Sequence, residues 1–446
     1  MFPVRFFTFA LLASPLCAQN PLPSDEQADG VSDAFRGMDA NGRIERPAFP
    51  VDIKHPERWR YTPPGRIVPG NPLDRFLISS FFSPIILSQS DIGTGGGLAF
   101  TDIDFRNQDY REFANVLLTY TSEGQQAYKM NWVRWLNHRK LDNGGIIRED
   151  RSTMGARLGY SNTLTRRFFG EGSSSKESAE TSYAEALSEV GFNIKRSFPD
   201  PGDNLVVSAG AKYQFHDLAP GRVSSVGTTD VNFPNAFKDG DEVSQFWIDL
   251  GLAYDSRDSV HQPYRGSFLG VGAHTAALQT GHDLGGILSV NGLRIFPLPG
   301  LLHDGGLGGE ENPPTDVIAV TAFVEGSYGE LPFYSLPSLG GNTLRGYGPN
   351  RFTDQAAAFG AIEYRFGVIP RGFGMTDRIR IERVNFAVFY EFGTVGDNVG
   401  DLADGDYLDS VGFGTRISLS REASFRVDVG FSDEGSNFTI GFGNAF

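Results

Sequence analysis

The chain has 446 residues, a formal net charge of −15 and a single cysteine, Cys17. Binding to nucleic-acid phosphates needs clustered Lys and Arg, so this acidic balance argues against a nucleic-acid partner. A single cysteine cannot form an internal disulfide or a thiolate metal site. The abundant Phe and Gly, 37 and 55 residues, are compatible with an all-β protein, either soluble or in an outer membrane.

The N-terminus has the pattern of a cleaved secretory signal peptide over residues 1–18. Met1–Arg5 carries one positive charge, Phe6–Leu12 is an apolar run too short to span a bilayer, and Ala18 ends a plausible cleavage site. Cys17 leaves a lipoprotein signal as the alternative, although the three residues before it make a poor lipobox. Residues 19–75 are rich in Pro, Asp and Gly without a sustained period, so we predict a periplasmic tail or linker there.

From about residue 76 to the end, the hydrophobic pattern has a period of two. Between Phe246 and Tyr254, for example, every second residue is apolar, and the residues between them include Asp249 and Gly251. Successive side chains of a strand point to opposite faces, so each such segment has one apolar face. We predict sixteen strands, near 76–88, 92–104, 112–122, 126–137, 152–161, 184–197, 203–215, 243–256, 266–277, 284–296, 316–328, 355–367, 381–393, 407–420, 422–432 and 436–446.

An even number of such strands predicts an all-β fold, a 16-stranded antiparallel transmembrane β-barrel over residues 76–446 with its apolar faces toward lipid. Closure pairs the backbone N–H and C=O groups that an open sheet edge would expose to hydrocarbon. Counting from the C-terminus makes 217–242, 329–354 and 394–406 external connections, and makes 297–315 an unusually long periplasmic one. A secreted β-sandwich, with its apolar faces turned inward, is the alternative.

The last predicted strand carries an apolar face that ends in an aromatic residue. Such an end resembles the recognition signal that the outer-membrane assembly machinery reads, whereas an ordinary edge strand of a soluble protein is the alternative. Together with the signal peptide, it predicts a location in the bacterial outer membrane. The residues of this C-terminal signal are Phe438, Ile440, Phe442 and Phe446.

Strand parity directs two carboxylates to the inner face of neighbouring strands. In 355–367 the apolar face comprises even-numbered residues, so Glu363 points inward, and the same reasoning in 381–393 turns Glu391 inward. Buried like charges repel, and each needs a partner. A guanidinium suits both carboxylates because it bonds them bidentately and stays charged. Arg345, in the preceding connection, is the first candidate partner, and Arg365 competes with it.

The residues around Arg345 resemble a motif of the bacterial surface antigen family, the superfamily of BamA, TamA and FhaC. In that family, a glycine-flanked Arg-Gly-Tyr forms the tip of a long loop folded back into the barrel lumen. The matching residues here are Gly340, Gly341, Leu344, Arg345, Gly346 and Tyr347.

Two strand motifs and two shorter segments extend the resemblance over 76–446. Gly360 to Glu363 matches the family's G-x-x-E motif, and Phe389 to Gly393 matches its F-x-D-x-G motif with Glu391 in place of Asp. Phe168–Gly172 and Tyr254–Asp258 also fit. The lumen partners of the loop that the resemblance implies are Gly360, Glu363, Phe389, Glu391 and Gly393.

The resemblance implies a barrel that inserts or transports polypeptides at the outer membrane, with lipids as an alternative cargo, and that is not an enzyme. The implied partners are outer-membrane lipids, lipopolysaccharide, the assembly machinery, and an unidentified client or periplasmic protein. Family members usually carry polypeptide-transport-associated (POTRA) domains before the barrel, and 19–75 is too short and Pro-rich to hold one. That departure leaves a passive pore or structural barrel as the alternative function.

In the family, the seam between the first and last strands opens and can template a client strand. Gly-rich 93–97 and the strand 436–446 would then form a weakly paired seam. Alternatively, these glycines make room for the folded-in loop.

Other signals are weaker. The external connection near residue 400 holds Asp397, Asp401, Asp404, Asp406 and Asp409, and could bind Ca²⁺. Its spacing is not that of an EF-hand, so a solvated acidic loop is the alternative. We find no G-x-S-x-G elbow and no H-E-x-x-H motif, and we therefore predict no catalytic residue, cofactor or resident metal.

Overall fold

The computed structural model describes residues 37–39, 42–67, 79–89, 91–237, 240–374, 380–421 and 423–446. The predicted signal peptide, 1–18, and the start of the first predicted strand lie outside these residues. Of residues 19–75, the structure therefore describes 37–39 and 42–67.

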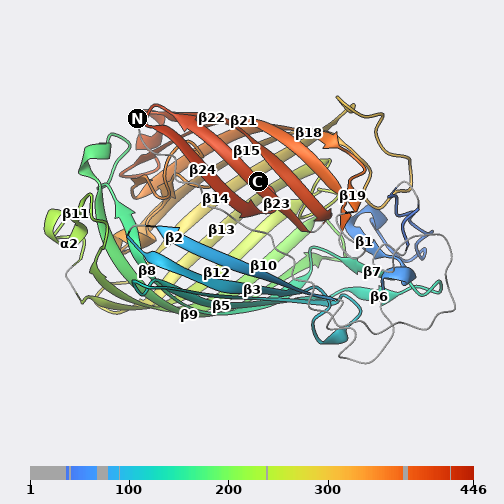
Figure 1. The fold of residues 1–446 in the computed structure, drawn as a ribbon, viewed down its shortest axis with the longest axis horizontal. Helices are drawn as coiled ribbons and strands as arrows, with labels where there is room; N and C mark the ends of the chain where they lie inside the picture. Colours follow the sequence, from blue (N-terminus) through green and yellow to red (C-terminus); the bar gives the residue numbers. More distant parts are fainter. Residues whose placement is uncertain are drawn as a thin grey trace.

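Sixteen strands form one antiparallel sheet that curves into a barrel, and this confirms the predicted fold class (Figure 1). Antiparallel registers join consecutive barrel strands from β2–β3 to β23–β24. Most boundaries lie close to the predicted ones, but β8 and β10 extend well beyond their predicted ends at 161 and 215, to Phe168 and Pro220. The barrel strands are β2 (Ser80–Gln89), β3 (Gly93–Asp102), β4 (Glu112–Thr121), β5 (Gln126–Trp135), β8 (Thr153–Phe168), β9 (Thr181–Phe198), β10 (Leu205–Pro220), β12 (Glu242–Asp255), β13 (Gly266–Gln279), β14 (Gly285–Leu298), β15 (Asp316–Gly329), β18 (Ala356–Ile369), β21 (Arg383–Gly396), β22 (Leu408–Ser420), β23 (Ala423–Ser432) and β24 (Gly435–Phe442).

Short elements occupy the two ends of the barrel. None of the helices in the described residues is long and apolar enough to cross a membrane. The short strands are β1 (Trp59–Thr62), β6 (His138–Lys140), β7 (Ile146–Glu149), β11 (Gly227–Thr228), β16 (Ser338–Leu339), β17 (Phe352–Thr353), β19 (Phe373–Gly374) and β20 (Arg380–Ile381). The helix α2 is Thr229–Asn232, and 3-10 turns span Pro56–Arg58, Pro64–Arg66, Phe105–Asn107, Glu177–Ala179, Phe333–Ser335 and Asp401–Ala403.

The two faces of the strands follow the period-two pattern. On β12, Leu250 is 57% exposed on the outer surface, whereas Trp247 is buried on the inner face with the Lys212 ammonium 4.6 Å from its ring centroid. The large exposed hydrophobic side chains recur at every second position of neighbouring strands, so the apolar surface of the sheet faces outward. An outward apolar face is the arrangement of a membrane barrel, and it excludes the β-sandwich.

The two ends of the barrel differ. In Figure 1, β11 and α2 lie at one end, and β1, β6, β7 and β19 lie at the other. The connection between β15 and β18 starts at the α2 end and folds into the lumen, where its Leu339, Leu344 and Phe352 form a buried cluster with Phe359 and Val395 of the wall. The main core of the protein therefore lies inside the barrel.

Residues 42–67 form a cap on the end opposite α2. Strand β1 pairs with β7, and β7 with β6, so that the segment adds one strand to a hairpin from the β5–β8 connection. Trp59 and Tyr61 are buried against Ile147. Side chains of the cap also reach other connections at that end: Arg58 bonds the carbonyl of Gly202, and Arg60 bonds that of Asp258 at 2.9 Å.

The long 297–315 connection contacts this cap, which gives its length a physical explanation. Glu45 bridges Glu310 in the antiparallel sense, the amide of Arg46 donates to the carbonyl of Gly309 at 2.8 Å, and that of Glu311 to Ile44 at 2.9 Å. The Arg46 guanidinium lies 2.9 Å from the Glu311 carboxylate. The connection reaches across the mouth of the barrel to hold the segment.

Two expectations, about the end of the last strand and about the strands that border the seam, were wrong. Strand β24 ends at Phe442, and Phe446 lies in the lumen, packed against the buried clusters there, rather than on the lipid-facing surface. Gly93–Gly97 lies on the second barrel strand, between β2 and β4, so it cannot border the seam. A Cβ at Gly95 would lie 2.0 Å from the carbonyl oxygen of Tyr120, so close backbone approach explains this glycine. The seam lies between β2 and β24, and the registers of the described strands include none between these two.

The cap should open locally at a lower free energy than the barrel. Trp59→Ala removes a buried indole from the cap core, at a cost of about 3–5 kcal/mol, and should raise amide hydrogen exchange across 42–67 while the barrel strands stay protected. Val51→Ala, at a fully exposed position of the same segment, is the control and should change nothing. Equal loss of protection in the barrel would show that cap and barrel unfold together.

Candidate functional site

A tight turn presents Arg345 at the tip of the lumen loop. Strands β16 and β17 pair with each other and close the base of this loop. Gly340, Gly341 and Leu344 have φ values of 119°, 72° and 52°, and the left-handed region that they occupy favours glycine. The amide of Gly341 donates to the carbonyl of Tyr347 at 3.1 Å, which folds the tip back on itself.

The loop tip lies directly against the barrel wall. A Cβ on Gly346 would lie 2.7 Å from the carbonyl group of Phe431 on β23, and a Cβ on Gly430 would lie 2.4 Å from the carbonyl carbon of Arg345. Asn437 of β24 donates to the carbonyls of Arg345 and Tyr347 at 3.1 and 3.0 Å. Both glycines are therefore required by the close approach of two backbones.

Arg345 contacts three carboxylates on three different strands. Its Nη1 lies 2.9 Å from Glu363 on β18 and 3.0 Å from Asp428 on β23, and its Nε lies 2.7 Å from Glu391 on β21. Its backbone amide also donates to Glu391 at 2.6 Å. The guanidinium lies 3.4 Å from the ring centroid of Phe389, a cation–π contact. The four side chains in these ion pairs are fully buried.

Three more arginines complete this cluster, which we call the lumen lock. Arg416 on β22 bonds both oxygens of Glu363, at 3.1 and 3.0 Å, and also pairs with Asp428. Arg365 contacts Glu363 at 2.6 Å. The members are Arg345, Arg365, Arg416, Arg426, Glu363, Glu391 and Asp428.

Burial decides the energetics of the lumen lock. Each charge loses its hydration, and only the ion pairs and hydrogen bonds compensate for that loss. Removing one partner therefore leaves an uncompensated buried charge, which is far more costly than losing an exposed ion pair. The cluster offers no nucleophile, and within the described residues no group of His, Cys, Asp or Glu is arranged to hold a metal, the acidic loop included. The ion pairs of the lumen lock attach the loop to the barrel wall.

The structure brings the predicted loop and wall residues together, with one exception. Phe389 lies under the Arg345 guanidinium, and a Cβ on Gly393 would meet Leu339 of the loop at 2.8 Å. The Tyr347 hydroxyl donates to Asp433 at 2.6 Å. Gly360, however, pairs with Phe392 on the outer parity, and the Phe392 ring covers it. Gly360 therefore does not face the lumen.

Sequence reasoning missed three of the seven members of the lumen lock. Arg416, Arg426 and Asp428 point inward on β22 and β23, where the alternating apolar residues face outward. The parity argument that turned Glu363 inward would have found all three.

The segment Phe168–Gly172 packs against the base of the loop. The Arg351 guanidinium lies 4.4 Å from the Phe169 ring centroid, and Gly172 donates to the carbonyl of Thr353 at 3.0 Å. Arg351 also pairs with Glu434 at 2.6 Å. These contacts attach the loop base to the α2 end of the barrel, away from the lumen lock.

The C-terminal residues separate into two locations. Phe438 and Ile440 are exposed on the outer surface. The side chain of Phe442 lies outside the described part of the chain. Phe446 lies in the lumen, where its carbonyl accepts a hydrogen bond from Arg365 at 2.9 Å.

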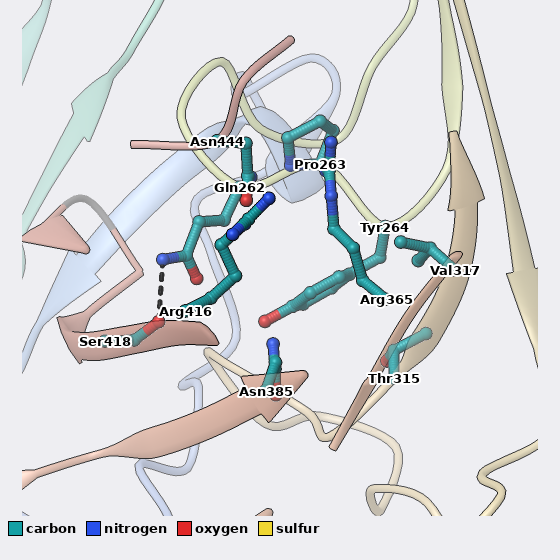
Figure 2. Close-up of a pocket in the computed structure, with 10 residues that line it drawn as sticks. All are labelled: Gln262, Pro263, Tyr264, Thr315, Val317, Arg365, Asn385, Arg416, Ser418 and Asn444. Carbon is teal, nitrogen blue, oxygen red and sulfur yellow. Dashed lines mark hydrogen bonds between the residues drawn. The ribbon is translucent and has the colours of Figure 1, made fainter. Parts of the chain in front are cut away.

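A small cavity of about 20 Å³, lined largely by polar side chains, lies between the lumen lock and the connections at the cap end. Figure 2 shows Arg365 and Arg416 of the lumen lock lining it together with Tyr264 and Gln262. Gln262 donates to the Ser418 hydroxyl at 2.9 Å. The cavity is thus lined both by the lumen lock and by the turn 256–265. This turn overlaps the segment Tyr254–Asp258 noted in the sequence and continues beyond it.

An apolar outer face and a loop attached inside the lumen define the class: an integral β-barrel of the outer membrane. Residues 112–446 match the family model described as the Omp85 superfamily domain. The chain therefore belongs to the Omp85 superfamily, whose barrels reside in the bacterial outer membrane and are protein insertion and translocation machines, not enzymes. The family predicted from the motifs is confirmed.

Solved structures resemble the chain at low sequence identity. One is BamA from Haemophilus ducreyi lacking POTRA domains 1–3, with 14% identity, a TM-score of 0.48, and coverage of 81% of this chain and 68% of that one. Another is CdiB from Acinetobacter baumannii, with 12% identity and a TM-score of 0.45, covering 81% of this chain. The chain spans only 58% of the length of CdiB. No curated protein matches the sequence.

Removing the central arginine should destabilise the whole barrel. Arg345→Ala leaves Glu363, Glu391 and Asp428 with fewer partners in a dry site, and should lower the free energy of unfolding by about 3–5 kcal/mol, measured by denaturant unfolding in lipid vesicles. Arg157→Ala is the control, because it removes a lumen arginine whose side chain is 43% exposed. That control should cost at most about 1 kcal/mol. Equal losses for the two variants would contradict the assignment.

The α2 end should show a specific pH dependence. Burial, with Asp397 and Asp401 nearby, raises the pKa of Asp354 in the loop base above its ordinary value. The folded state then binds the proton more tightly than the unfolded state, so stability from this group falls as pH rises through the raised pKa. At pH 8, Asp354→Asn should unfold at a higher denaturant concentration than wild type. The difference between the two midpoints should shrink toward pH 4. A gap that does not change with pH would exclude titration of Asp354.

Proposed function

We propose that this barrel inserts or transports polypeptides at the outer membrane, and that the lumen lock holds it closed between transport events. The supporting observation is the number of attachments that Arg345 makes: three carboxylates on three strands, with its guanidinium over Phe389. A loop needed only to fill space would not require a fully buried charge cluster, since apolar packing of the same volume is as stable.

A buried ion cluster suits a gate because its intermediate states are unfavourable. Partial withdrawal of the loop would remove both the backbone and the side-chain bonds of Arg345 from the buried carboxylate of Glu391, which keeps the bond from the Ser410 hydroxyl. The loop is therefore either attached or fully released. Release would hydrate the inner wall. The wall opposite already carries exposed polar side chains, among them Arg157, Asn193 and Lys195, so an opened lumen would be lined by polar groups.

We also propose that residues 42–67 close the second mouth of the barrel. Arg58 and Arg60 anchor this segment to two separate connections, and Arg66 pairs with Glu382 of a third at 3.1 Å. A client entering from that side would have to displace the cap or pass beside it. The segment would then be a moving part of the barrel rather than a tail.

A passive pore is the second candidate, and the same exposed polar wall favours it. In that case the loop would only narrow a permanent aqueous path, and the lumen lock would be structural. The two functions differ in what happens when the loop is released.

Ion conductance in planar bilayers tests the proposal. Wild type should give small, flickering currents, and Arg345→Ala should give larger, longer openings because the loop is no longer held to the wall. Arg157→Ala, which removes the same charge from the open wall, is the matched control and should gate like wild type.

Large, steady wild-type currents that ignore Arg345→Ala would indicate a pore and overturn the gating proposal. Transport itself is tested by deletion of the gene in its host, with the surface proteome as the readout. Loss of one or a few outer-membrane or secreted proteins, restored by wild type and not by Arg345→Ala, is expected. An unchanged proteome would overturn the transport assignment.

A further inference from the structure

The turn between β3 and β4 has an unusual backbone. Arg106, Asn107, Asp109 and Tyr110 all have positive φ, between 53° and 60°, and none is glycine. Each such residue costs of order 1 kcal/mol or more, and persists only where its surroundings fix it. The turn lies at the cap end of the barrel, outside the site described above.

Contacts within the turn, from the cap and from the neighbouring β6–β7 hairpin hold this strained turn. The Tyr110 hydroxyl donates to the carbonyl of Arg66 at 2.9 Å, and the carboxylate of Asp104 accepts from the amide of Tyr110 at 2.8 Å. His138 of β6 bonds the carbonyl of Asp109 at 2.8 Å. The strain is therefore compensated by several partners, and its consequence is a fixed position for Arg106.

Arg106 lies on the outer wall of the barrel, where it and a second arginine, Arg134, bond the same carboxylate. Glu112 accepts two bonds from Arg106, at 2.7 and 2.6 Å, and one from Arg134 at 2.7 Å. The Trp132 indole donates to the same carboxylate at 3.2 Å, and the Arg106 guanidinium lies 6.0 Å from the Trp132 ring. Glu112 is 0% exposed, whereas the Arg106 side chain is 54% exposed.

This group faces lipid rather than the lumen. Glu112 and Arg134 are register partners, and they continue the parity of the outward Leu118 and Tyr128 on the same two strands. From Tyr120 to Glu112 the strand rises about 27 Å, or about 20 Å along the membrane normal at a tilt near 40°. Glu112 and its arginines therefore lie at the edge of the apolar band, at the level of lipid headgroups, with an indole beside them as is usual at that depth.

The group formed by Arg106, Arg134 and Glu112 carries a net charge of one positive. Two guanidinium groups share a single carboxylate, and the N–H groups that Glu112 does not use are accessible at Arg106. Glu112 orients the two arginines, so a phosphate group would meet donors whose rotamers are already fixed. The apolar strand surface beside them would take acyl chains.

We propose that Arg106, Arg134 and Trp132 form a binding site for the phosphate of a phospholipid headgroup in the membrane leaflet on the cap side. Arg106 and Arg134 bond the phosphate oxygens, Glu112 positions both guanidinium groups, and Trp132 packs against the glycerol region. The bound lipid also secures the strained turn, and with it the cap contacts of Tyr110.

Native mass spectrometry of the full-length protein in detergent, titrated with phosphatidylglycerol, tests the site. Wild type should retain one lipid at least tenfold more tightly than the double variant Arg106→Gln, Arg134→Gln. Arg196→Gln is the matched control, because Arg196 is an outward arginine 5.4 Å from the ring of Phe198, without a buried carboxylate. It should bind like wild type.

Two further arms keep the test independent of folding. On wild type alone, diacylglycerol with the same acyl chains but no phosphate should bind at least tenfold more weakly than phosphatidylglycerol. Inorganic phosphate should not displace the lipid at equal concentration. Equal retention by the double variant, equal binding of diacylglycerol, or displacement by inorganic phosphate would each overturn the assignment.

Discussion

The burial of four arginines and three carboxylates inside the barrel is the constraint on which the rest of the structure depends. These charges come from the loop and from β18, β21, β22 and β23, so satisfying them fixes the positions of four strands and the loop tip together. The glycines at 346 and 430 follow from this, because the loop backbone must approach the wall closely for Arg345 to reach its partners. Phe389 provides the apolar floor that keeps water from the ion pairs.

Strand parity predicted much of this from sequence, because period-two alternation persists along strands of ten or more residues and the side chains cannot change face without a bulge. Glu363 and Glu391 were directed inward on that ground. The same rule turns Arg416 and Asp428 inward, so the sequence carried the signal for these two residues as well. Gly360 was misplaced because a motif, rather than parity, assigned it to the lumen.

Other features could not be predicted from one sequence. Alternation does not reveal where hydrogen bonding stops, so Phe446 was assigned to a strand that ends at Phe442. The cap has no period at all, and its contacts join residues far apart in the chain, such as Arg60 with Asp258. Segments without periodicity give no signal of burial until their partners are known. The turn at 103–111 is similar, since the residue types of Arg106 and Tyr110 give no indication of a positive φ.

The lumen lock and the cap are physically continuous, although they close opposite ends of the lumen. Arg60 of the cap bonds the carbonyl of Asp258, and the Asp258 carboxylate pairs with Arg421 at 2.6 Å, next to β22. In the same turn, Gln262 bonds Ser418 of β22, the strand that carries Arg416 of the lumen lock. Because these groups are buried, displacement of the cap would take the Arg60 donor away from the Asp258 carbonyl, in the turn that also contacts β22. Opening the cap therefore changes the contacts of a turn that also bonds the strand of Arg416. The strength of these contacts, rather than the distance between the two closures, determines how strongly opening of the cap and release of the loop are coupled.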